Sequence, residues 1–259
     1  MRVAVAARGN KKLPGLTVKD GYTVHPFDEK FGVRTSGLIA GRHLKSGHKH
    51  DRHSTAYFGV APSVFAALIR RWKRLSPAAC VEETVFLDIG AGMGRAVLLA
   101  AETPFREVVG LELHPTLARI ARRNLTRWRG AGRVNARKVR IVEGDAVEFP
   151  LPATPTLAFL FNPFGSSMLK RLLKKWRDTL ATQPNRLDLI YVNNEHESAL
   201  GPVSGFSRVF LGKVARSRAD AIADYKIMAN QPDGEYMSSN FEDCSIWRWN
   251  GMGKSKPSR

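Results

Sequence analysis

The chain has 259 residues, of which 43% are hydrophobic, and it carries a formal net charge of +18. This length and apolar content suffice for one folded domain with additions, and they exclude a largely disordered chain. Two cysteines, Cys80 and Cys244, are too few for a disulfide scaffold, and no apolar run approaches the ~18 residues of a membrane span. We therefore expect a soluble cytoplasmic protein.

The N-terminal third contains two segments of different character. Residues 1–23 are polar and basic and are predicted to be a flexible arm. Residues 24–78 are predicted to form an N-terminal cap and a helix. In that helix Pro62 suits the first turn, and the following apolar residues recur at helical spacing: Val64, Phe65, Leu68, Ile69 and Trp72.

Four histidines, His43, His48, His50 and His53, cluster between residues 41 and 53. Such a cluster raises the question of a zinc site. The spacing is irregular, Asp51 is the one carboxylate in the segment, and its lysines and arginines would repel a cation. We expect a basic mobile loop here and no metal site.

The central motif runs from Thr84 to Ala101. A short apolar run leads into Asp88 and three alternating glycines, and an aliphatic run with good helix propensity follows. Glycine permits the tight turn and close approach to a ligand that such a strand–turn–helix unit needs. The pattern D-x-G-x-G-x-G differs from the dinucleotide and P-loop fingerprints. A carboxylate at the strand end would repel a pyrophosphate and suits a ligand that carries an ammonium group.

The stretch from Asp88 to Gly94 resembles the first motif of class I S-adenosylmethionine-dependent methyltransferases. Further landmarks of that family follow in order. Glu112, at the end of an apolar strand, matches the ribose-binding carboxylate, and Asp145 matches the adenine-contacting acid, with Ala146 beside it. The resemblance implies S-adenosyl-L-methionine as cofactor. The cofactor-binding residues that it implies are Asp88, Gly90, Gly92, Gly94, Glu112, Asp145, Ala146 and Asn162. Taken singly, Glu112 or Asp145 is also typical of a helix N-cap.

Residues 162–165 read Asn-Pro-Phe-Gly at the end of a fourth apolar strand. Amino-group methyltransferases of this superfamily carry a D/N-P-P-Y/F tetrad at the same place. The resemblance implies that Asn162 holds a target nitrogen and that Phe164 packs over it as the second catalytic residue. One proline is missing and the aromatic lies one residue early. The alternative is that Asn162 caps a turn and Phe164 packs in the core.

The predicted elements alternate between strand and helix up to residue 192. Apolar stripes indicate helices from Pro115 and from Ser166 or Ser167, and residues 187–192 indicate a fifth strand. Residues 206–214 and 244–249 have strand character and are expected to form a closing antiparallel pair. The fold class is therefore α/β, a three-layer Rossmann-like sandwich around a mostly parallel seven-stranded sheet. We assign residues 79–250 to this core and 251–259 to a basic tail. Residues 31–37, F-G-V-R-T-S-G, resemble a segment of an uncharacterised bacterial branch.

The positive charge is clustered. Residues 117–140 contain nine arginines and lysines and no acid, and residues 70–74 and 170–177 add more. The clustering fits a polyanionic partner, although arginines that cover solvated faces would give the same pattern. We predict a methyltransferase that N-methylates a macromolecule, either nucleic acid or the lysines of a protein. The alternative is a cofactor-binding or nucleic-acid-binding protein on the same fold without turnover.

Overall fold

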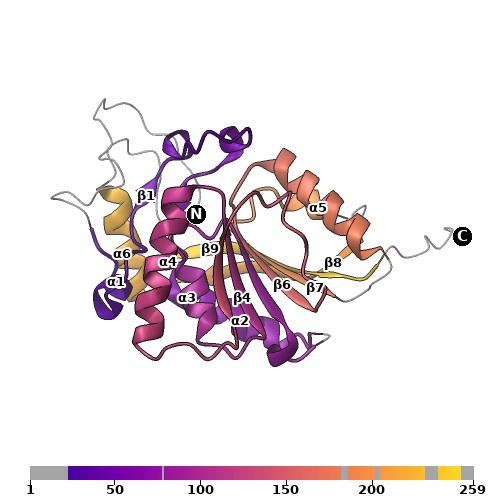
Figure 1. Cartoon of the computed structure of the whole chain (residues 1–259), viewed down its shortest axis with the longest axis horizontal. Helices are drawn as coiled ribbons and strands as arrows, with labels where there is room; N and C mark the ends of the chain where they lie inside the picture. The colour runs from indigo at the N-terminus through magenta and orange to yellow at the C-terminus, as the bar shows by residue number, and fades with distance from the viewer. Residues whose placement is uncertain (1–22, 78, 182–185, 202–204, 231–238, 252–259) are drawn as a thin grey trace, which may run out of the picture.

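The computed structural model describes residues 23–251 except for 78, 182–185, 202–204 and 231–238. A twisted sheet forms the centre of the molecule, and helices cover both of its faces (Figure 1). Apart from residues 23 and 251, the predicted N-terminal arm and C-terminal tail lie outside the described residues. No helix of the described part is long and apolar enough to cross a membrane.

The described residues contain six α-helices: α1 (Pro26–Phe31), α2 (Pro62–Arg74), α3 (Arg95–Ala101), α4 (Pro115–Gly130), α5 (Ser166–Leu180) and α6 (Arg218–Ala229). The strands are β1 (Leu38–Ile39), β2 (Tyr57–Phe58), β3 (Val85–Ile89), β4 (Glu107–Glu112), β5 (Val139–Glu143), β6 (Thr156–Phe161), β7 (Leu187–Val192), β8 (Phe206–Ala215) and β9 (Phe241–Trp249). Helices α2, α4 and α5 begin where the sequence predicts them. Gly165, and neither Ser166 nor Ser167, occupies the N-cap of α5, and no side chain caps that helix.

Seven strands form the main sheet in the order β5-β4-β3-β6-β7-β9-β8. Strands β3 to β7 are parallel, and β9 runs antiparallel to both β7 and β8. This confirms the predicted Rossmann-like sheet and its closing antiparallel pair. The strand order changes direction between β3 and β6, and in sheets of this kind ligands bind outside the carboxyl ends at such a switch point.

Both faces of the central strands are buried, which explains their nearly continuous apolar sequences. Residues from α2, α3 and α4, including Leu68, Val97 and Leu125, pack on one face. Leu172 and Trp176 of α5 pack on the other. Figure 1 shows α4 and α5 on opposite sides of the sheet. The two most basic helices therefore do not share a face.

A buried polar network attaches the N-terminal cap to the core. The Asp28 carboxylate accepts hydrogen bonds from the backbone N–H of Ser36 at 2.6 Å and from its hydroxyl at 2.7 Å, and from both corresponding groups of Thr35. Arg95, the first residue of α3, donates from Nε to the Thr35 hydroxyl at 2.7 Å and also reaches the Gly59 carbonyl. The Thr-Ser pair thus fixes the cap against the helix that follows the glycine turn.

Helix α6 was not predicted from the sequence. Its inner side carries two buried acids, Asp220 and Asp224, and Asp224 faces the Nε of Arg216 at 3.0 Å. Because burial disfavours its charge, the pKa of Asp224 is raised to about 7, although Arg216 opposes the shift. A helix whose buried side is partly ionic lacks the apolar periodicity by which helices are predicted.

Candidate functional site

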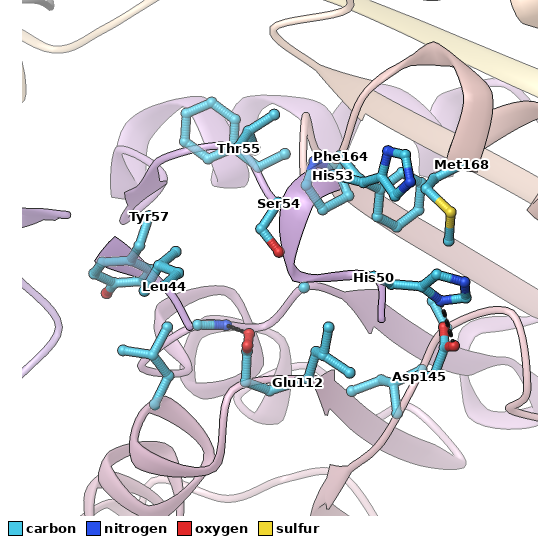
Figure 2. A pocket seen from close by; sticks show the side chains of 18 of the residues that line it. Leu44, His50, His53, Ser54, Thr55, Tyr57, Glu112, Asp145, Phe164 and Met168 are labelled. Atoms are coloured by element: carbon cyan, nitrogen blue, oxygen red, sulfur yellow. Dashed lines mark hydrogen bonds and ion pairs between the residues drawn. The ribbon is translucent and has the colours of Figure 1, made fainter. Parts of the chain in front are cut away.

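A cavity lies at the carboxyl ends of β3, β4 and β5, on the side where the strand order changes direction. Leu44, His50 and residues 53–58 line one side of it, and Figure 2 shows Leu44, Ser54 and Tyr57 on the side of Glu112 and His50 beside Asp145. The lining residues are Leu44, His50, His53, Ser54, Thr55, Ala56, Tyr57, Phe58, Gly90, Gly92, Leu111, Glu112, Leu113, Leu117, Gly144, Asp145, Ala146, Phe161, Pro163, Phe164 and Met168.

The glycine turn forms one wall of this cavity. Gly90 and Gly92 have φ angles of +75° and +56°, in the left-handed region that favours glycine. A Cβ atom on Gly90 would lie 2.6 Å from Cβ of Pro163, and one on Gly92 would overlap the ring of Tyr57. Both positions therefore need glycine for space as well as for conformation. Gly94 does not line the cavity; it caps α3 and packs against Ala121 of α4.

Glu112 is the buried carboxylate of the cavity. Its Oε2 accepts a hydrogen bond from the Gly92 N–H at 2.6 Å, and its Oε1 accepts one from the His114 N–H at 2.8 Å. Burial raises the pKa of Glu112, and these backbone donors partly offset the rise. Each oxygen keeps a further lone pair, so the group can accept hydrogen bonds from the hydroxyls of a ligand.

Asp88 lies in the interior of β3 and does not line the cavity. Its Oδ2 is buried and has no hydrogen-bond partner among the described residues. Burial, and then the nearby Glu112 carboxylate, raise the pKa of Asp88 well above its usual value. Two buried acids thus lie near each other on neighbouring strands, Asp88 within β3 and Glu112 at the end of β4. Such a site favours a ligand that brings hydroxyl donors or positive charge.

Asp145 contacts residues 41–53, the segment that contains the four clustered histidines and is called the histidine segment below. Its Oδ1 accepts a hydrogen bond from the Val147 N–H at 2.9 Å, and its Oδ2 lies 2.7 Å from Nδ1 of His50 (Figure 2). The guanidinium of Arg171 lies 3.1 Å from Nε2 of His50. Because arginine only donates, Nε2 accepts and Nδ1 carries the proton that it donates to Asp145.

The histidine segment is folded over the cavity and contains two short 3₁₀ turns, Gly41–His43 and Asp51–His53. Ligand atoms of His48, His50 and Asp145 lie within 4.8 Å of one another, a spacing at which a cation can bind. The sequence interpretation overlooked Asp145 as a partner because it lies 95 residues from His50. The Arg171 guanidinium beside His50 disfavours a cation at this place.

A second cavity of about 330 Å³ adjoins the first. Ser54, Thr55, Ala56, Phe58 and Phe161 line both cavities, and Gly41, Arg42, Asn162, Asn193 and Glu195 complete the second. Of the predicted catalytic pair, Phe164 lines the first cavity and Asn162 lines the second. The Asn162 Oδ1 accepts a hydrogen bond from the Tyr191 hydroxyl at 3.2 Å, and its Nδ2 donates to Oε2 of Glu195 at 3.1 Å.

Sequence reasoning did not single out Asn193 and Glu195 of the second cavity, nor Arg171, which contacts His50 beside the first. Asn193 and Glu195 follow the strand at residues 187–192 directly, and polar residues at the end of a predicted parallel strand are a usable signal. Arg171 gave no such signal, because it lies among the many basic residues of an amphipathic helix.

A family model matches part of the core. Residues 86–183 match the family model of a methyltransferase domain. A search of curated proteins found no match. The match agrees with the resemblance read from the glycine motif: residues 86–183 of the chain match a methyltransferase domain.

Several solved structures share the fold at low identity. An RNA methyltransferase from Salinibacter ruber, solved with S-adenosyl-L-homocysteine, is 18% identical, with a TM-score of 0.41 over 74% of this chain and 97% of that one. TrmN from Thermus thermophilus is 19% identical, with a TM-score of 0.45 over 73% and 49%. The [4+2]-cyclase SpnF is 17% identical, with a TM-score of 0.49 over 72% and 83%. At these scores the likenesses say nothing about the substrate of this chain.

Proposed function

With residues 86–183 a methyltransferase domain, we propose that this chain transfers the methyl group of S-adenosylmethionine to an amino nitrogen of a nucleic acid. The observation that carries the proposal is the pair of adjoining cavities at the switch point of the sheet. Their shared walls allow a donor in one cavity and an acceptor in the other to meet.

The first cavity fits the cofactor in the chemistry of its groups. Glu112 offers lone pairs to ribose hydroxyls, Gly90 and Gly92 form a wall of backbone without side chains, and Asp145 with Ala146 lies where the adenine is expected. The buried Asp88 carboxyl, whose Oδ2 has no partner among the described residues, lies behind this wall, and a positively charged ligand would favour its ionised form. Because His50 occupies Oδ2 of Asp145, this histidine must give way before an adenine amino group can bond to that oxygen.

The bound cofactor supplies a methyl group already activated by its positive sulfur. The chain then has to align the acceptor, exclude water and remove a proton. Leu44, His50 and residues 53–58 line one side of the first cavity, where they can limit the access of water to a bound ligand. Phe58 and Phe161 form apolar walls on which a flat acceptor can pack. No nucleophile or metal of the protein is needed for such a transfer.

The charge around the cavities favours nucleic acid over a cationic lysine as the acceptor. Arg171, Lys174 and Lys175 of α5 line an open groove beside Val147 with Asp178 as its one acid, and Arg171 reaches His50 at the first cavity. A basic groove next to the site attracts a phosphate backbone and repels a basic peptide.

The α4 side of the sheet is a weaker choice for the phosphate-binding face. There several basic residues pair with the protein's own acids, such as Arg122 with Glu143 and Arg140 with Glu107. We therefore assign the nucleic acid to the α5 side.

The proposal is tested by methyl labelling. The purified protein and S-adenosylmethionine with a tritiated methyl group are incubated with a cell extract, and the product is treated with nuclease or with protease. Label that nuclease releases and protease leaves is the expected result. Label that only protease releases would assign a protein substrate instead. Cofactor binding without any labelling would favour a binding protein without turnover.

A further inference from the structure

We infer that Glu195 is the group that binds the acceptor amine and takes its proton, and that the acceptor is the exocyclic amino group of a nucleobase. The inference rests on the proposed function and names a residue and a substrate class within it. It arises from two asparagines, Asn162 and Asn193, that hold the Glu195 carboxylate in the second cavity.

Asn162 and Asn193 share an uncommon backbone conformation. Their φ angles are 41° and 50°, and Ser76 is the one other described non-glycine residue with a positive φ. Each follows the last residue of a strand, and those last residues, Phe161 and Val192, are register partners in the parallel pair β6–β7. Left-handed backbone at non-glycine residues is costly and concentrates at functional sites. Here two such residues stand side by side at the edge of one cavity.

The two side chains point to the same carboxylate. Asn162 Nδ2 donates to Oε2 of Glu195 at 3.1 Å, and Asn193 Nδ2 lies 3.5 Å from Oε1. Both asparagines are buried, whereas Glu195 is exposed at the cavity. The Tyr191 hydroxyl bonds to Oδ1 of Asn162, so the amide is fixed with its NH₂ toward Glu195. Two buried amides therefore orient one solvent-accessible carboxylate.

We therefore assign to Glu195 the role of holding the target nitrogen, which the resemblance of the sequence motif assigns to Asn162. The Asn162 side-chain oxygen already accepts a bond from Tyr191, and its main-chain oxygen accepts one from the Thr55 hydroxyl. A carboxylate is the stronger acceptor for an incoming N–H, because bonds to a charged group are roughly twice as strong as neutral ones. It can also accept a proton, which an amide cannot do at neutral pH.

The walls of the cavity indicate a flat amine. Phe58 and Phe161 give the cavity apolar walls, whereas Asn162 and Glu195 give it polar ones. Aromatic side chains stack on bases that have been taken out of a strand, and polar groups then read the base edge. An amino-bearing base satisfies both sides of the cavity, since its ring contacts the phenylalanines and its N–H bonds to the carboxylate.

The reaction moves one methyl group to the amino nitrogen and one proton away from it. The lone pair of the amino nitrogen attacks the methyl carbon, the carbon–sulfur bond breaks, and its electron pair goes to sulfur, which becomes a neutral thioether. The nitrogen becomes positively charged as it gains the methyl group and loses one proton to the Glu195 carboxylate. The protonated Glu195 returns that proton to water after the product leaves. No oxidant, metal or further reactant is required.

The test compares Glu195→Gln with Glu197→Gln. Glu197 is a nearby acid that pairs with Arg208 and does not line the second cavity, so it is the matched control. We expect Glu195→Gln to lower the rate of methyl transfer about 100-fold, the usual contribution of a general base, and to leave the affinity for S-adenosyl-L-homocysteine within twofold. The acid limb of the pH–rate profile should disappear in this variant. Glu195→Asp should recover part of the rate, and the control should match the wild type.

A binding measurement gives a readout that does not depend on turnover. In the presence of saturating S-adenosyl-L-homocysteine, the wild type should bind adenosine about tenfold more tightly than inosine, and cytidine more tightly than uridine. Glu195→Gln should lose this preference. If Glu195→Gln methylates nucleic acid at the full rate and keeps the acid limb of its pH–rate profile, the inference is overturned and the proposed function stays intact. Label on protein alone would contradict the proposed function, and equal binding of all four nucleosides by the wild type would contradict the inference.

Discussion

His50 and Asp145 lie 95 residues apart in the chain, yet Nδ1 of His50 lies 2.7 Å from Oδ2 of Asp145 at the wall of the first cavity. The bond joins the segment that covers the cavity to the strand end where the adenine is expected. If Asp145 binds the adenine as we propose, His50 and the cofactor compete for one oxygen. The covering segment is closed onto the protein when that oxygen is bonded to His50.

Replacement of His50 by alanine should consequently tighten cofactor binding. A hydrogen bond to a charged group contributes about 1.5–3 kcal/mol, and even the lower end corresponds to roughly tenfold in affinity. We expect His50→Ala to bind S-adenosyl-L-homocysteine about tenfold more tightly in a calorimetric titration. His53→Ala is the matched control, because His53 lines the same cavity and has no hydrogen bond to Asp145. Weaker binding by His50→Ala would mean that the histidine holds the cofactor.

The proposed phosphate-binding face makes a prediction about salt. Each lysine that contacts a phosphate of a single strand contributes about 0.7 to the slope of log affinity against log salt. The variant Lys174→Gln, at a lysine that lines the groove on α5, should weaken binding of a single-stranded RNA and lower that slope by about 0.7. The matched variant Arg123→Gln, on an exposed position of α4 across the sheet, should change neither. Equal losses in both variants would contradict the assignment to α5.

The cap makes the stability sensitive to acid. Burial, followed by the charge of Arg95, lowers the pKa of His25 from 6.5 to about 4, while Asp220 opposes the shift. The folded state thus binds fewer protons than the unfolded state between these values. The stability that His25 contributes is complete above pH 6.5 and is lost as the pH falls toward 4.

The variant His25→Asn isolates this effect, because asparagine is also a good N-cap for α1. Between pH 7.5 and pH 5 the wild type should lose about 1 to 2 kcal/mol more unfolding free energy than the variant, measured by urea denaturation. Asp224, present in both proteins, changes stability in the opposite direction because its pKa is raised. An equal loss in both proteins would show that His25 does not cause the acid sensitivity.

Much of the fold could be predicted because its strands are apolar and its helices amphipathic. Strands β3, β4 and β6 were predicted from short apolar runs that are followed by glycine or by polar residues. The cavity walls formed by Gly90, Gly92 and Glu112 followed from the family resemblance. Whether these residues bind the cofactor stays a prediction.

The rest depends on contacts between distant residues that no local pattern encodes. The bond between His50 and Asp145 and the holding of Glu195 by Asn162 each join separate elements. Helix α6 was missed because its inner side buries acids that pair with Arg216. Buried polar networks of this kind lack periodicity, so they become visible only when the chain is folded.

Asp88 and Glu112 are both predicted from the motif to support cofactor binding, but the structure gives them different places. Glu112 lines the cavity, and Asp88 is buried outside its lining. We therefore expect Asp88→Asn, which keeps the shape and removes the charge, to weaken S-adenosyl-L-homocysteine binding less than Glu112→Ala does. The measurement is a calorimetric titration of both variants under one set of conditions. A larger loss in Asp88→Asn would indicate direct contact between Asp88 and the ligand.

The most direct test of the account is the binding of S-adenosyl-L-homocysteine to the wild type and to Glu112→Ala, with circular dichroism to verify that both are folded. Glu143→Ala is the control, because Glu143 is the register partner of Glu112 on β5 and does not line the cavity. We expect the wild type and the control to bind alike. We expect Glu112→Ala to bind at least tenfold more weakly, as the loss of a charge-assisted hydrogen bond of about 1.5–3 kcal/mol requires. Unchanged affinity in a folded Glu112→Ala protein would contradict the cofactor site described for this chain.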